Sequence, residues 1–352
     1  MDKNQRLFYI HIGDLMDFFA SMTFNPGTIK NICSNLEKYE PRRKAIKNIL
    51  YTPIMVSETT TNIFRLLKKK DKYNVMFDSG GFFVQQGKID SKELFIKLSE
   101  FYSNNKWGDY YVLPDSPPTS SDSDKIVEYK IRDTITNANL FYNQLDSHLQ
   151  KKCIPVVQGH TKEQILRCID SYADLNVTRI GFGSFGTSGA NNGINIITNK
   201  SMEIVEYMMK IVEDYSLEVH AFGVGGTKSM PKLYEAGFTS FDSAGWKRAA
   251  GFGDVVFPFH STHNITHNTS EKRGKILSRD NFAKIKHESN HSCFFCDDFK
   301  KLQSSEMYRV LHNLLSISDT CELLNNGHND CHLDNYFSKN MVQNHYSGCE
   351  IS

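Results

Sequence analysis

Short apolar runs alternate with amphipathic stretches over most of this 352-residue chain, and this alternation limits its fold more than any other feature. The apolar runs have the length and composition of buried strands, and the stretches between them have a helical period. Strands are predicted at 8–12, 49–55, 73–78, 110–114, 153–158, 178–183, 217–224 and 239–242. Helices are predicted at 91–103, 124–149, 161–174, 201–215 and 229–236. Such alternation is typical of a parallel sheet covered by helices.

The number of predicted strands favours one architecture within the α/β class. Eight parallel strands, each followed by a helix, close into a (β/α)8 TIM barrel, and an open doubly wound sheet is the alternative. Helix N-caps are predicted at Asp124 and Thr161, where a short polar side chain precedes a helical stretch. No glycine-rich phosphate-binding motif follows a predicted strand, which argues against the usual nucleotide cradles.

The composition narrows the class of protein. The formal net charge is +1, so any surface that binds nucleic acid must be a local patch. The sequence contains no apolar signal-peptide region and no long uncharged apolar segment, so we expect neither secretion nor a membrane partner. Eight cysteines in a chain of this length do not resemble a disulfide scaffold. We therefore expect a cytoplasmic protein.

Polar residues stand where four of the predicted strands end, namely Asp78-Ser79-Gly80-Gly81, Asp115, Gln158 and Asp242. Each aspartate alone would be an ordinary cap or turn residue, but the ends of parallel strands converge on one mouth of a barrel. There, one carboxylate can attack an electrophilic carbon while another manages protons, and an amide can bind the edge of a heterocycle. A Gly-Gly turn lets the backbone approach a flat ring. This arrangement predicts an enzyme.

In type and order, these residues resemble the tRNA-guanine transglycosylase superfamily from about residue 70 to about residue 315. The matching segments are Asp78-Ser79-Gly80-Gly81-Phe82, Asp115 before Pro117-Pro118-Thr119, Val157-Gln158-Gly159, Phe222-Gly223-Val224-Gly225, and Phe241-Asp242. The resemblance implies that Asp242 is the nucleophile and that Asp78 is a second catalytic or substrate-positioning carboxylate. It also implies a base pocket in which Asp115 and Gln158 bind the purine edge. The other implied substrate-binding residues are Ser79, Gly80, Gly81, Phe82, Gly183, Ser184 and Phe222.

The resemblance implies a double displacement. Asp242 attacks the sugar C1′ while guanine leaves, and a 7-deazaguanine then enters the same pocket and attacks the glycosyl-enzyme. Two displacements retain the anomeric configuration, as in retaining glycosidases. The base would lie between Phe82 and Phe222, and the buried polar groups would reject a wrong base because it leaves them unpaired.

A second group of residues points to a metal. His291, Cys293 and Cys296, followed by His312, form a set of two histidines and two cysteines that zinc accepts. The superfamily carries a structural zinc on three cysteines and a later histidine, so His291 departs from its pattern. We predict a structural Zn2+ on these four residues, with His287 as a competing ligand. The expected organisation is a barrel at 1–280, a small zinc-binding subdomain at 281–320, and a weakly ordered tail at 321–352 rich in Asn, His and Ser.

Departures from the superfamily pattern bear on the substrate. The Pro-Thr-Arg segment that follows the nucleophile in the tRNA-acting enzymes is replaced by Ser243-Ala244-Gly245-Trp246-Lys247-Arg248. A glutamate that suits a cationic aminomethyl base is replaced by Gly189, which favours a neutral base such as 7-cyano-7-deazaguanine (preQ0). The chain therefore resembles the DpdA-type DNA 7-deazaguanine transglycosylases. Such an enzyme must extract guanosine from the stack, and Trp246 would fill the gap or stack while Lys247 and Arg248 bind phosphate.

Three rival interpretations stay open from the sequence. They are a tRNA-guanine transglycosylase with the same chemistry, a non-catalytic partner subunit, and an unrelated barrel hydrolase. Retention of both Asp78 and Asp242 argues against the partner subunit, and the zinc spacing argues against the hydrolase. The sequence also leaves open the DNA sequence preference, the need for helper proteins that open the duplex, and the oligomeric state, although members of the superfamily often form homodimers.

Overall fold

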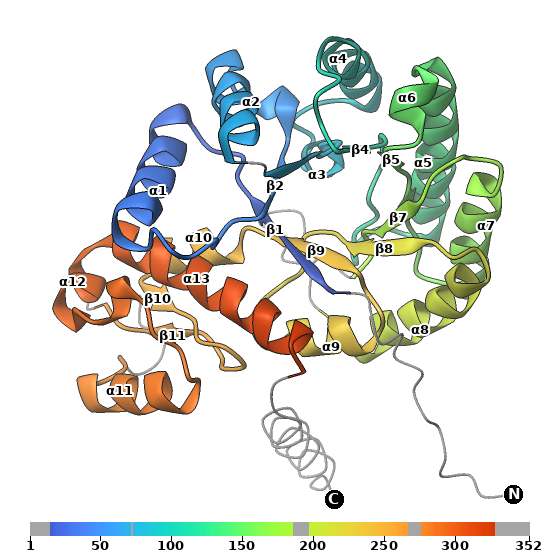
Figure 1. Cartoon of the computed structure of the whole chain (residues 1–352). Coiled ribbons are helices and arrows are strands. Elements are labelled where there is room, and N and C mark those ends of the chain that lie inside the picture. The colour runs from blue at the N-terminus through green and yellow to red at the C-terminus, as the bar shows by residue number, and fades with distance from the viewer. Residues whose placement is uncertain (1–14, 72, 186–196, 267–275, 328–352) are drawn as a thin grey trace, which may run out of the picture.

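A computed structural model describes residues 15–71, 73–185, 197–266 and 276–327 as parallel strands surrounded by helices (Figure 1). The nine strands of the main sheet are β1 Asp17–Ser21, β2 Asn48–Tyr51, β3 Asn74–Phe77, β4 Tyr110–Val112, β5 Cys153–Ile154, β6 Val156–Val157, β7 Arg179–Phe182, β8 Glu218–Ala221 and β9 Ser240–Ser243. The predicted α/β class and parallel sheet are confirmed.

The sheet is a nearly closed barrel. Its strand order is β5-β4-β3-β2-β1-β9-β8-β7-β6, and every pairing between neighbours is parallel. The two end strands, β5 and β6, are consecutive in sequence and separated only by Pro155, whose missing N–H interrupts the ladder. The strand predicted at 153–158 thus supplies both edge strands of the sheet.

Most predicted strands lie within two residues of an observed one, and the first is the exception. The strand predicted at 8–12 lies outside the described residues, whereas the barrel begins with β1 at Asp17–Ser21. Only Phe18, Phe19 and Ala20 are apolar in that strand, so its signal in the sequence is short. The strand predicted at 49–55 ends earlier because Pro53 starts the 3-10 turn η1, Pro53–Met55.

Helices form the outer layer of the barrel (Figure 1). They are α1 Pro26–Tyr39, α2 Glu58–Asp71, α3 Gly81–Gln85, α4 Ser91–Asn104, α5 Asp124–Gln144, α6 Ser147–Gln150, α7 Lys162–Tyr172, α8 Asn199–Asp214, α9 Met230–Glu235 and α10 Gly245–Gly251. Thr161 is confirmed as an N-cap and forms a capping box with Gln164. The N-cap of α5 is Ser123, one residue before the predicted Asp124, and the single helix predicted at 124–149 is interrupted at Leu145-Asp146.

Two apolar layers hold the barrel together. Six buried side chains, one from each of six strands, fill its interior: Phe19, Leu50, Met76, Val112, Ile154 and Val156. A larger cluster packs between the strands and the helices. The alternation is visible in β1, where Phe19 belongs to the interior cluster and its neighbours Phe18 and Ala20 belong to the outer one. Burial of such a side chain stabilises the fold by roughly 1.5–3 kcal/mol.

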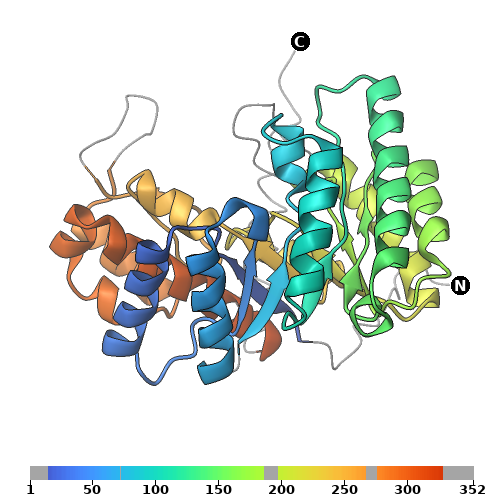
Figure 2. The same ribbon diagram turned by 90° about the horizontal axis from the view of Figure 1, so that it is seen from above.

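The C-terminal elements lie beside the barrel (Figure 2). They are a hairpin of β10 Asp254–Val255 and β11 His263–Asn264, followed by α11 Arg279–Glu288, the turn η3 Phe294–Cys296, α12 Phe299–Ser304 and α13 Glu306–Asn325. Helix α13 contacts β1, α1, α9 and α10, so it belongs to the outer layer of the barrel as well as to this region. Within the described residues, no helix is both long and apolar enough to cross a membrane.

The boundary predicted at residue 320 is wrong, because it falls inside α13. The helix continues to Asn325, whose side chain exchanges two hydrogen bonds with the backbone of Met16, and Cys321 is buried against the same residue. The weakly ordered tail predicted from residue 321 is therefore corrected for 321–325, which are helical. Residues 328–352 lie outside the described part of the chain.

Candidate active site and metal centre

A cavity of about 870 Å3 opens at the carboxyl ends of the barrel strands. Each of the four predicted strand-end residues lines it: Asp78 after β3, Asp115 after β4, Gln158 after β6 and Asp242 in β9. Ser79, Gly81, Phe82, Gly183 and Phe222 also line the cavity. The structure thus brings together residues that are up to 164 positions apart (242 − 78) in the sequence. The polar segments after separate strands were sufficient to predict this convergence.

Asp115 and Gln158 form a bonded pair in the wall of the cavity. The Gln158 Nε2 donates to Asp115 Oδ2 at 2.8 Å, and both side chains are buried. Ser79 Oγ donates to Asp115 Oδ1 at 2.7 Å, and Ser184 Oγ donates to Gln158 Oε1 at 2.5 Å. Burial raises the pKa of Asp115, and the hydrogen bonds from Ser79 and Gln158 oppose this rise. We refer to Ser79, Asp115, Gln158 and Ser184 as the amide–carboxylate network.

Two positions next to this network can hold only glycine, because a side chain there would clash with Asp115 or Gln158. A Cβ at Gly81 would lie 2.2 Å from Asp115 Oδ1, and a Cβ at Gly183 would lie 2.5 Å from Gln158 Nε2. Neither contact is sterically tolerable, so any larger residue at these positions would displace the carboxylate or the amide. Gly80, which precedes α3, has φ +85° and therefore occupies the left-handed region that favours glycine.

Asp78 holds a proton more tightly than an ordinary aspartate. Burial raises its pKa to about 7, the neighbouring carboxylates of Asp242 and Asp115 add to the rise, and a hydrogen bond from Thr52 opposes it. Thr52 Oγ1 donates to Asp78 Oδ2 at 2.7 Å. A carboxyl group that titrates near neutrality can donate a proton in one step and accept one in the next.

One carboxylate oxygen of Asp242 faces residues of the neighbouring strand β8 and of the loop that follows it. The side chain is only 6% exposed, and its Oδ1 accepts a hydrogen bond from the Gly223 backbone N–H at 2.7 Å. The His220 Nε2 lies 3.5 Å from the same oxygen. Asp242 lines the cavity, as a nucleophilic carboxylate must.

The aromatic residues predicted at the site divide into two groups. Phe82, which is 36% exposed, and Phe222 line the cavity. The prediction that Trp246 contacts nucleic acid is wrong for this structure, because the indole is fully buried. Its Nε1 donates to the Ser243 carbonyl at 2.9 Å, and its ring packs edge-on against Phe24. The indole therefore anchors the loop after β9.

Of the two cations predicted to contact phosphate, one faces the cavity. Arg248 lines it, whereas Lys247 pairs with Glu306 on α13. Sequence reasoning missed Lys228 and Lys232, which line the cavity from the β8–α9 connection and α9. Spacing gave no indication of this, since these lysines are 16 to 20 positions from Arg248 in the sequence (248 − 232 and 248 − 228). We call Lys228, Lys232 and Arg248 the rim cations.

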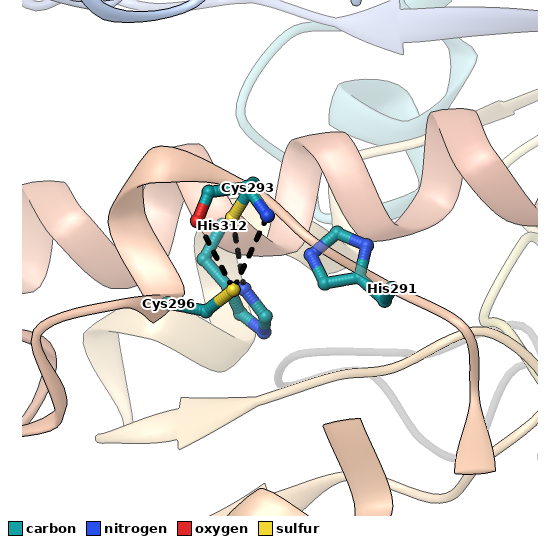
Figure 3. Close-up of side chains that lie close together, drawn as sticks. All are labelled: His291, Cys293, Cys296 and His312. Atoms are coloured by element: carbon teal, nitrogen blue, oxygen red, sulfur yellow. Dashed lines mark hydrogen bonds between the residues drawn. The ribbon is translucent and has the colours of Figure 1, made fainter. Parts of the chain in front are cut away.

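The four predicted metal ligands come together as predicted. His291, Cys293, Cys296 and His312 are all buried, and one ligand atom from each lies within 4.8 Å of the others (Figure 3). Cys293 directly precedes the turn η3, Cys296 is the last residue of that turn, and His312 lies in α13. His287, the competing ligand, is not a member of the cluster.

The donor set of this cluster fits a tetrahedral ion. Zinc bound by two nitrogens and two sulfurs requires ligand atoms roughly 3.3–3.8 Å apart. Cys293 Sγ lies 3.5 Å from His312 Nδ1. The hydrogen bond with Cys293 holds the pKa of Cys296 far below its usual range, whereas burial raises the pKa of Cys293. A buried thiolate is the form that binds a metal.

Sequence reasoning missed the residues that support this cluster. His291 Nδ1 lies 2.7 Å from Asp319 Oδ2, and Arg43 donates to both oxygens of the same carboxylate at 2.7 Å. A carboxylate on the outer nitrogen fixes the orientation of a metal-binding histidine. Because Arg43 follows α1 and Asp319 lies in α13, this chain of contacts connects the cluster to the barrel.

No family model matches this chain, and no curated protein matches it. The resemblance to the transglycosylases therefore depends on the motif residues, and any functional assignment depends on the geometry of the cavity.

Proposed function

We propose that this chain is a guanine transglycosylase that exchanges guanine in DNA for a preQ0-like 7-deazaguanine through a covalent aspartyl–C1′ intermediate. One observation carries the proposal: Asp78, Asp242 and three members of the amide–carboxylate network, Ser79, Asp115 and Gln158, line a single cavity at the carboxyl ends of the strands. We also propose that β5 and β6 are two halves of one strand, which makes the fold a (β/α)8 barrel with its site at the usual end.

The amide–carboxylate network is complementary to guanine. Its donors on N1 and the 2-amino group would face the carboxylate of Asp115, and its O6 acceptor would face the Gln158 amide. An adenine would place an acceptor and a donor against the wrong partners and leave buried groups unpaired, which costs about 1–3 kcal/mol for each group. Phe82 and Phe222, which line the same cavity, would contact the two faces of the ring.

The reaction proceeds in two displacements. Asp242 forms a bond to C1′ as the C1′–N9 bond breaks, the electron pair goes to N9 of guanine, and Asp78 supplies the proton. The entering 7-deazaguanine then forms a bond to C1′ through the same ring position, the C1′–O bond breaks, and its electron pair returns to Asp242. Asp78 recovers the proton that the entering base loses. A pKa of about 7 suits Asp78 to both steps.

The first of three features favours DNA over tRNA, and the other two fit a nucleic-acid substrate and a neutral base. The segment after Asp242 forms the short helix α10, held by the buried Trp246, in place of the superfamily's Pro-Thr-Arg segment. The rim cations provide positive charge at the cavity mouth although the formal net charge of the chain is only +1. Gly189 stands where the superfamily carries a glutamate, although this position lies outside the described residues, and its lack of charge favours a neutral nitrile substituent.

We further propose that His291, Cys293, Cys296 and His312 hold a structural Zn2+. When bound, the ion supplies a cross-link between η3 and α13. Because α13 also packs on β1 and α10, the cross-link stabilises the part of the barrel wall next to the nucleophile strand.

Incorporation of labelled preQ0 and labelled guanine into duplex DNA, single-stranded DNA and bulk tRNA tests the proposal. We expect label in DNA, with none in a control duplex of adenine and thymine alone. Label in tRNA only would contradict the DNA assignment and support the tRNA-acting alternative. Label in no polymer, with purified chain that is folded and zinc-loaded, would contradict the transglycosylase assignment and support a non-catalytic partner subunit.

A further inference from the structure

His220 is a fully buried histidine that the double-displacement mechanism does not use. It lies in β8, and its exposed fraction is 0%. The register of β8 and β9 pairs His220 with Ser240, and Asp242 lies two residues further along β9 on the same face of the strand. The imidazole therefore lies beside both Ser240 and Asp242 without any contribution from a loop.

The two ring nitrogens of His220 have different surroundings. Nδ1 lies 2.9 Å from Ser240 Oγ, within hydrogen-bonding distance. Nε2 has no hydrogen-bond partner among the described residues, and it lies 3.5 Å from Asp242 Oδ1. A buried polar nitrogen without a partner destabilises the fold, so its persistence next to the nucleophile requires a reason.

The protonation state follows from these surroundings. Burial lowers the pKa of His220, and the nearby Asp242 carboxylate opposes this change, so the ring is neutral around pH 7. A neutral imidazole carries one N–H. When the Ser240 hydroxyl donates to Nδ1, the proton is on Nε2 and points at Asp242 Oδ1.

The ring itself is held in place. It packs edge-on against Phe19 of β1, with 5.5 Å between ring centroids, and it lies 4.5 Å from the ring of Phe222. Both neighbours are apolar, so they offer Nε2 no other acceptor. The position of the donor is therefore set by strand register and aromatic packing, as expected of a residue that orients another.

We propose that His220 is the positioning residue of Asp242, and that Ser240, His220 and the Gly223 N–H together hold Oδ1 so that Oδ2 is the attacking oxygen. The inference rests on the proposed function, because it assigns a role toward the nucleophile of that reaction. Gly223 already donates to Oδ1, and a protonated His220 Nε2, 3.5 Å from the same atom, would become the second donor when the two atoms close to hydrogen-bonding distance. Among the described residues, no donor contacts Oδ2, which leaves its lone pairs for C1′.

The step that this arrangement serves is the second displacement. As Oδ2 forms its bond to C1′, the carboxylate becomes an ester and its charge disappears from both oxygens. As the second displacement returns the electron pair, negative charge develops again on the carboxylate, and two fixed donors on Oδ1 stabilise it. Donors placed in advance where charge develops accelerate such steps by up to about 10²–10³.

Substitutions at His220 and Ser240 test the inference. His220→Phe keeps an aromatic ring but removes the donor, and His220→Gln keeps a donor at the position of Nε2. We expect His220→Phe to lower kcat for base exchange by about 10- to 100-fold with KM for the base within twofold, and His220→Gln to recover most of that loss. Ser240→Ala is expected to lower kcat less, and to add nothing in the His220→Phe background.

The result that overturns the inference is a wild-type kcat in His220→Phe, or an equal loss in His220→Phe and His220→Gln. A measurement independent of exchange separates this failure from failure of the proposed function. Nitrogen NMR of labelled histidine, with the His220 resonances assigned by their absence from the Phe variant, should show protonated Nε2 and unprotonated Nδ1. A proton on Nδ1 would overturn the inference even if the chain exchanges no base, and Ser240→Ala provides the same test should His220→Phe fail to fold.

Discussion

The cavity and the metal cluster each contain a set of buried polar side chains, but these side chains obtain their hydrogen-bond partners in different ways. In the cavity, Asp115 and Gln158 bond to each other and to two serine hydroxyls. In the cluster, the Cys296 sulfur accepts a hydrogen bond from the Cys293 backbone N–H, and the Nε2 of His312 is buried without a hydrogen-bond partner among the described residues. The difference teaches that the polar groups of the cavity satisfy one another, whereas the cluster leaves a buried nitrogen that a bound ion would satisfy.

This comparison separates function from stability. Under the proposed function, polar groups that satisfy one another would release a base readily, which a reaction with a leaving and an entering base requires. Groups that depend on an ion for their partners link the ion to folding. Variants of the cavity should therefore lose exchange and keep the fold, and variants of the cluster should lose stability first.

The largest effect is expected from the nucleophile. Asp242→Asn keeps the shape and the acceptor for the Gly223 N–H, and it removes the charged oxygen that attacks C1′. Exchange should fall by at least about 10³-fold, with thermal unfolding unchanged. The control is Asp170→Asn on the exposed face of α7, which should exchange normally. Full activity of Asp242→Asn would show that the nucleophile is another residue.

The second effect concerns the metal cluster. Cys296→Ala should remove the ion and lower the free energy of unfolding by more than about 3 kcal/mol, since metal binding is coupled to folding. Cys321→Ala is a matched control, because this buried cysteine lies on α13 outside the cluster. Elemental analysis and thermal unfolding measure both. A Cys296→Ala chain with undiminished metal content, or a wild type without metal, would remove the contrast between the two sites.

In both sites, the sequence predicted the central residues but not the residues that support them. Asp78, Asp115, Gln158 and Asp242 were predictable because each ends a strand, and strand ends meet at one mouth. The four metal ligands were predictable from residue type and local spacing. Their supporting partners were not, since His220 depends on the register of two strands and Asp319 depends on how α13 packs against Arg43.

The same reasoning explains two predictions that failed. Trp246 follows the nucleophile at a spacing that suits a surface role, but the packing of α10 against α13 buries it. The Asn-, His- and Ser-rich composition from residue 321 onward predicted a weakly ordered tail, but Cys321 and Leu324 continue the buried face of α13. Both outcomes depend on contacts between distant segments, which local composition does not contain.

A third effect sharpens the account of base selection. Gln158→Ala removes the amide that donates to Asp115 Oδ2 and leaves the Ser79 hydroxyl as the side-chain donor to this carboxylate. KM for guanine should rise by about 10- to 100-fold with a smaller change in kcat, because a binding contact is lost. Ser184→Ala, which removes only the support of the amide, should raise KM by less than about tenfold. Steady-state exchange kinetics measure both, and a larger effect of Ser184→Ala would contradict the assigned order.

The smallest effect is a gain in stability. The pKa of Asp78 in the folded chain is about 7, against 3.8 for an ordinary aspartate. The folded state therefore binds more protons between these pH values, and stability is lost as the pH rises from about 4 through about 7. Asp78→Asn cannot ionise, so at pH 8 it should be more stable than the wild type by on the order of 1–2 kcal/mol, with little difference at pH 4.

Thermal unfolding of Asp78→Asn and wild type across this pH range measures that difference, and the variant should exchange no base. A variant that is less stable than the wild type at pH 8 would show that the hydrogen bond from Thr52 outweighs the cost of burying the charge. The cavity would then resemble the metal cluster in contributing to stability.

The most direct test of the central claim is to locate the covalent intermediate. The wild-type chain is mixed with end-labelled DNA that contains guanine, quenched with denaturant, and digested for peptide mapping by mass spectrometry. The account predicts a sugar-linked adduct on Asp242, absent from Asp242→Asn. An adduct on another residue, or exchange of base without any adduct in a time course that resolves single turnovers, would contradict it.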